Sequence, residues 1–68
     1  MGQTLADRMN AGIKAHGPLP SPTAYKMHWV LEARVVGARL EARINSKWYG
    51  VLPDDARMWD RMLADKGF

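Results

Sequence analysis

The sequence predicts one small α+β domain over residues 1–68, with three helices and a two-stranded β-hairpin between the second and third helices. Three observations predict this class. Apolar residues recur at helical spacing near both ends of the chain. Residues 39–44 alternate between apolar and charged side chains, which is typical of a strand. A polar turn and an aromatic, apolar run follow, as in a hairpin.

The first helix is expected over residues 4–16. Thr4 can cap it, and Asp7 three residues later completes a capping-box pattern. Its apolar stripe consists of Leu5, Met9 and Ile13. Gly12 weakens a helix by about 1 kcal/mol relative to Ala, so the last turn is expected to fray. Residues 17–22, GPLPSP, hold three prolines and end the helix.

The second helix is expected over residues 23–34. Ser21 and Pro22 form a typical start, with Ser as the N-cap and Pro at the first helical position. Ala24, Met27 and Leu31 would share one face. Because residues 39–44 also contain good helix formers, a single helix over residues 23–44 remains an alternative.

The hairpin is expected to follow the pair of valines and the glycine at positions 35–37. Leu40, Ala42 and Ile44 would face the core. Residues 45–47 form the turn, because Asn tolerates a left-handed backbone. Residues 48–52 have the β-rich composition of a return strand. Trp48 is expected in the core, packed against Trp29 or the last helix.

The last helix is expected to start at Pro53. Asp54 and Asp55 in its first turn favour the positive end of the helix dipole. Its apolar face would consist of Met58, Trp59, Met62 and Leu63. Gly67 is a plausible C-terminal cap, and Phe68 could fold back onto the helix.

The composition excludes several function classes. No cysteine is present and the two histidines have no ligand spacing, so we expect neither a metal nor a cofactor. No nucleophile–base pair or phosphate-binding glycine loop occurs, so an enzyme is not expected. No apolar run approaches the roughly 20 residues of a membrane helix, and the first residues lack the pattern of a signal peptide. A cytoplasmic protein without membrane contact is therefore expected.

The basic charge is concentrated before the last helix. Residues 1–53 hold seven Lys or Arg and three acids, whereas residues 54–68 hold three Lys or Arg and four acids. A local basic excess of this kind favours a polyanionic partner. Arg39 and Arg43 would project from the outer face of the hairpin, with Lys47 at its tip, toward phosphates or a narrow groove.

Several short features occur in a characteristic order between residues 28 and 56. The features are Trp29, the RVVGAR step at residues 34–39, Lys47-Trp48-Tyr49 and Pro53-Asp54-Asp55-Ala56. In this order and spacing they resemble the C-terminal part of the MerR-like winged helix-turn-helix modules of phage and integrative-element excisionases. The resemblance implies a winged helix-turn-helix fold, in which residues 23–34 form the recognition helix and the hairpin forms the wing.

The resemblance also implies a small architectural DNA-binding protein, either an excisionase that directs recombination or a transcriptional regulator of a mobile element. Such a protein would bind double-stranded DNA, associate with further copies of itself cooperatively on DNA, and work with an integrase. The residues expected to contact DNA are Thr23, Lys26, His28, Arg34, Arg39, Arg43 and Lys47. The alternative is a small helical, phage-borne protein that binds and inhibits a host protein. It would use the single helix over residues 23–44 and an exposed face of Met and Trp.

Overall fold

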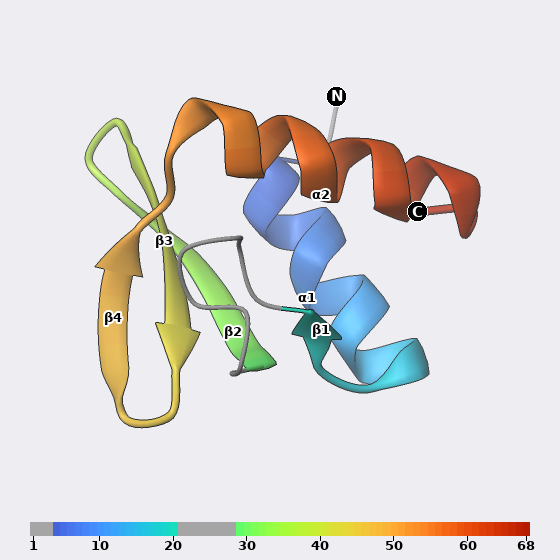
Figure 1. The fold of residues 1–68 in the computed structure, drawn as a ribbon, viewed down its shortest axis with the longest axis horizontal. Coiled ribbons are helices and arrows are strands. Elements are labelled where there is room, and N and C mark those ends of the chain that lie inside the picture. Colours follow the sequence, from blue (N-terminus) through green and yellow to red (C-terminus); the bar gives the residue numbers. More distant parts are fainter. Residues whose placement is uncertain (1–3, 21–28) are drawn as a thin grey trace.

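The computed structural model describes residues 4–20 and 29–68 and contains two helices beside a four-stranded antiparallel sheet (Figure 1). In chain order the elements are α1 (Leu5–His16), β1 (Leu19–Pro20), β2 (Trp29–Val36), β3 (Arg39–Ile44), β4 (Lys47–Gly50) and α2 (Pro53–Asp65). The strands are ordered β1-β2-β3-β4 across the sheet, so each strand pairs with its neighbours in sequence. Both helices lie on the same side of the sheet (Figure 1).

The α+β class is confirmed, but the predicted arrangement of three helices and a two-stranded wing is wrong. Residues 29–34, expected to end the second helix, belong to β2, and β2 pairs with β3 along most of its length. The alternative of one helix over residues 23–44 is wrong for the same reason. The proposed helix start at Ser21 and Pro22 lies outside the described residues. A winged helix-turn-helix is therefore not the fold of this chain.

An irregularity in β2 interrupts the two-residue alternation that marks a strand in the sequence. The register with β3 shifts between Val30 and Glu32, so one extra residue, Leu31, interrupts the alternation. Val30 and Ala33 are consequently both buried although they lie three positions apart. Spacing of three is typical of a helix face, and the remaining residues of this segment include good helix formers. Pairing with β3 outweighs that local preference.

The first helix forms as predicted. The Thr4 hydroxyl accepts a hydrogen bond from Asp7 N, and the Asp7 carboxylate accepts one from Thr4 N, which completes the capping box. Gly12 has a packing role that its low helix propensity did not reveal. A Cβ at this position would lie 2.7 Å from Leu63 Cδ2 of α2, so the glycine lets the two helices approach closely.

The core lies between the helices and the inner face of the sheet. Its buried members are Ala6, Met9, Leu19, Val30, Ala33, Ala42, Ile44, Trp59 and Leu63. Trp59 is the largest fully buried side chain, and its indole Nε1 donates a hydrogen bond of 2.9 Å to Pro20 O. This bond links α2 to β1 across the core, because the indole needs a buried acceptor and the carbonyl of the short edge strand supplies one.

The predicted pairing of two strands is confirmed as β3 and β4, and the apolar face of β3 points inward as expected. The predicted turn at residues 45–47 and return strand at residues 48–52 are shifted, because Lys47 already pairs with Ile44 and β4 ends at Gly50. Asn45 begins the connecting turn with φ of +59°, the left-handed conformation that Asn tolerates. The expected helix start at Pro53 is also confirmed, with two acids in its first turn. Phe68 folds back as expected, since its amide donates to Leu63 O and its ring lies 5.3 Å from the His16 ring. In the described part of the chain, no helix has the length and apolar composition needed to cross a membrane.

Candidate functional site

The outer face of the sheet, which points away from both helices, carries most of the predicted site residues that the structure describes. Because side chains alternate along a strand, the register places one set of charged and aromatic residues on this face. We call this set the outer face; its members are Glu32, Arg34, Arg39, Glu41, Arg43 and Trp48. The set is contributed by three adjacent strands, and no described helix packs over it.

Two arginines of the outer face form ion pairs across neighbouring strands. Arg34 Nε lies 2.8 Å from Glu41 Oε1, and Arg43 Nε lies 3.2 Å from Glu32 Oε1. Each pair joins residues that are directly opposite in the β2–β3 register. Exposed pairs of this kind contribute only about 0.2–1 kcal/mol, so a stronger anionic ligand can displace the carboxylates at low cost.

Arg39 differs from the other two arginines of the outer face. Within the described residues, no carboxylate lies within ion-pairing distance of its guanidinium. Its Nη2 lies 2.9 Å from the position that a Cβ on Gly50 would occupy, so the side chain extends over β4 where a glycine leaves room. The outer face thus offers one exposed arginine without an acidic partner in the described part of the chain.

Trp48 lies on the outer face, so the prediction that it packs in the core is wrong. The Arg34 guanidinium carbon stands 3.9 Å from the centre of the Trp48 ring, at cation–π distance. The two-residue turn pairs Ile44 with Lys47, and this register turns Tyr49 toward the core and Trp48 away from it. Trp48 is half-buried, Trp29 is 58% exposed and Trp59 is fully buried, so the tryptophans do not form one cluster. Counting residues from a two-residue turn would have placed Trp48 on the outer face.

Lys47 does not share the outer face with Arg39 and Arg43. It pairs with the buried residue Ile44, and directly opposed residues point to the same side of a sheet. Lys47 is therefore an exposed cation at the tip of the hairpin, on the helix side of the sheet. Arg34 joins the outer face from β2 and not from a recognition helix.

Three of the predicted DNA-contacting residues, Thr23, Lys26 and His28, lie outside the described residues. The structure therefore brings together Arg34, Arg39 and Arg43 and separates Lys47 from them. Among the residues described, no group of three potential metal ligands is close enough to hold an ion. Two of the four acids of α2 have structural partners: Asp54 pairs with Arg57, and Asp60 pairs with Arg8.

Sequence reasoning missed one polar side chain that shapes the sheet edge. Asn10 of α1 uses both ends of its side-chain amide on Ala33 of β2: Nδ2 donates to Ala33 O, and Ala33 N donates to Oδ1, each at 2.8 Å. The amide takes the place of a neighbouring strand at this point of the edge. No signal in the sequence pairs an asparagine of a helix with a residue 23 positions later.

Comparison with known proteins adds no relative, since the chain matches no family model, no curated protein and no solved structure.

Proposed function

We propose that this protein binds double-stranded DNA through the outer face of its sheet. The observation that carries the proposal is the presence of Arg34, Arg39 and Arg43 on one solvent-facing surface. Strands can enter the major groove of DNA, which is about 12 Å wide and admits a two-stranded ribbon. Arginine is well suited to this position because its planar guanidinium can contact either a phosphate or the edge of a guanine.

The existing ion pairs influence the strength of this interaction. Three arginines and two glutamates leave the outer face with an excess of one positive charge. Binding would exchange the carboxylates of Glu32 and Glu41 for phosphate oxygens, which favours weak binding that is sensitive to salt. The Trp48 ring stacks against the Arg34 guanidinium and holds it in place.

The start of α2 is a poorer candidate for phosphate contact than the sheet. Helix N-termini often bind anions, but here Asp54 and Asp55 already place negative charge in the first turn. The sheet therefore supports the proposal better than either described helix does.

A role in recombination or transcription of a mobile element is also proposed, and it rests only on the order of the short sequence features between residues 28 and 56, since the fold is not the one that the resemblance implies. Cooperative binding of several copies is also proposed, because a single small face offers less area than specific DNA recognition usually buries. An integrase as partner follows from the resemblance alone.

The test is a fluorescence anisotropy titration of labelled duplex DNA at several salt concentrations. With three arginines involved, the plot of log K against log salt should have a slope of about −2 to −3. Arg43→Gln should weaken binding and reduce the magnitude of the slope by about one unit. Arg61→Gln is the matched control, because it removes the same charge from an exposed position on α2.

Two outcomes would contradict the proposal. Absence of binding at low salt and micromolar protein would exclude DNA as a ligand. Equal losses in Arg43→Gln and Arg61→Gln would show that net charge, and not the outer face, is responsible for binding.

A further inference from the structure

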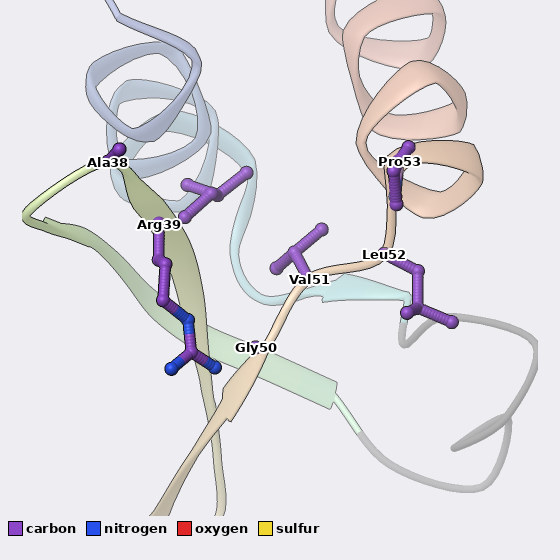
Figure 2. A pocket seen from close by; sticks show the side chains of 7 residues that line it. Ala38, Arg39, Gly50, Val51, Leu52 and Pro53 are labelled. Atoms are coloured by element: carbon purple, nitrogen blue, oxygen red, sulfur yellow. The ribbon is translucent and has the colours of Figure 1, made fainter.

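A shallow hollow of about 440 Å³ lies where β4 leads into α2 (Figure 2). Its lining residues are Ala38, Arg39, Leu40, Gly50, Val51, Leu52 and Pro53. The only charged side chain among these seven is Arg39, and most of the others are apolar. Leu52 is 62% exposed, so its side chain is accessible to a ligand.

Arg39 is positioned in this hollow by its neighbour. Figure 2 shows its side chain extending beside β4 toward Gly50, and a Cβ at Gly50 would lie 2.9 Å from Nη2. Any other residue at this position would push the guanidinium away. In the described part of the chain no carboxylate neutralises it. A guanidinium beside apolar walls recognises a carboxylate that stands next to an apolar group.

The edge of β4 continues into the same hollow. Beyond β4 the sheet has no further described strand, so β4 is an edge. Tyr49 pairs with Ala42, and Val51 N donates to Leu40 O at 3.0 Å. Because antiparallel strands alternate, the backbone groups of Trp48 and Gly50 point away from β3. Such a row of backbone donors and acceptors is a template for an added strand.

We propose that the hollow beside Arg39 binds a carboxylate carried next to an apolar side chain of an extended peptide, which adds to the open edge of β4. A peptide suits this hollow because its lining is mostly apolar and contains a single guanidinium, which matches one carboxylate beside an apolar group. A single carboxylate can pair with Arg39 while the peptide backbone bonds to β4. The partner is therefore a protein segment with one acidic group. The site shares Arg39 with the proposed DNA-binding surface, so a bound peptide and DNA would compete for this residue.

The first experiment uses a small probe on the ¹⁵N-labelled full chain. Sodium 4-methylpentanoate should shift the NMR signals of Arg39 Nε–H and of the Gly50 and Val51 amides, with a dissociation constant on the order of millimolar. The neutral 4-methylpentanamide should leave these signals unchanged. Arg39→Gln should abolish the shifts, whereas the matched control Arg43→Gln should retain them.

The second experiment uses the peptide acetyl-Lys-Thr-Val-Thr-Val-Leu with a free C-terminal carboxylate. It should bind about tenfold or more tightly than the small probe and slow hydrogen exchange of the Trp48 and Gly50 amides, because these amides become hydrogen-bonded. Equal binding of the carboxylate and amide probes, or retention of binding in Arg39→Gln, would overturn the carboxylate site. Unchanged exchange at β4 would overturn the added strand. Similar shifts of all three arginines with inorganic phosphate would indicate unspecific anion binding and overturn the site. None of these outcomes depends on DNA.

Discussion

Replacing Asn10 by Ala should destabilise the protein strongly, although Asn is a poorer helix former than Ala. The substitution removes two hydrogen bonds of 2.8 Å and leaves the N–H and C=O of Ala33 without their partner. Each hydrogen bond contributes about 0.5–1.5 kcal/mol, and an unpaired buried group costs about 1–3 kcal/mol. Because these groups are only partly buried, the loss lies at the lower end of this range. After subtracting a gain of about 0.5 kcal/mol in helix propensity, we expect the free energy of unfolding to fall by about 2–3 kcal/mol.

The assay is urea unfolding followed by circular dichroism, with the free energy of unfolding obtained by linear extrapolation. A domain of this size has a total stability of roughly 3–10 kcal/mol, so the loss should be easy to measure. Lys14→Ala, at an exposed position of the same helix, is the control and should change stability little. An Asn10→Ala variant within about 0.5 kcal/mol of the parent would refute the reasoning.

Asn10→Asp separates the two hydrogen bonds. The carboxylate still accepts from Ala33 N, but its second oxygen faces Ala33 O, where the amide donated before. The carbonyl disfavours the charged form, so the pKa of this introduced carboxyl should rise above its unfolded value of about 3.9. The protonated carboxyl therefore stabilises the folded state. This stabilisation is fully present below the unfolded pKa and is lost as the pH rises through the folded pKa. The variant should therefore approach the parent's stability only in acid, whereas a constant difference across pH would contradict this account.

Two further predictions concern packing and are tested by the same unfolding assay. Gly12→Ala gains about 1 kcal/mol of helix propensity, but overpacking typically costs 1–3 kcal/mol, and the new Cβ would meet the fully buried Leu63 at 2.7 Å. We expect the free energy of unfolding to fall by about 1 kcal/mol in total. The loss should be smaller when Leu63 is also replaced by Val. A stabilised Gly12→Ala variant would show that the Leu63 side chain can move aside without cost. Trp48→Ala should cost only about 1–2 kcal/mol, because the ring is half-buried and stacks with Arg34 on the outer face. A loss near the 3–5 kcal/mol of a core aromatic would place Trp48 in the core after all.

The two ends of the fold could be predicted because their signals are local. The capping box at Thr4 and the Pro-Asp-Asp start of α2 specify helix boundaries through neighbouring residues. The β3–β4 hairpin was equally accessible, since the alternation of Arg39–Ile44 and the turn at Asn45 lie within a few residues of each other. These elements needed no knowledge of distant contacts.

The middle of the chain could not be predicted in the same way. In β2 the extra residue Leu31 interrupts the alternation that would indicate a strand, and the pairing with β3 decides the structure of this segment. The candidate site was affected directly: Arg39 and Arg43 were placed on the outer face correctly, but Arg34 was assigned to a helix. Gly12 shows the same limit, because its propensity is visible in the sequence and its contact with Leu63 is not.

The position of α2 has a consequence for the order of folding. Although α2 follows β4 directly, it packs mainly on α1, where Arg8 contacts Asp60, 52 residues away, and donates from Nε to Phe68 O at 2.9 Å. The β2–β3 and β3–β4 hairpins close short loops, whereas joining the two helices closes a loop that spans most of the chain, which costs more entropy. We therefore expect the hairpins to form early and the two helices to meet late, so that the part of the core that α2 covers stays open to solvent until the last step.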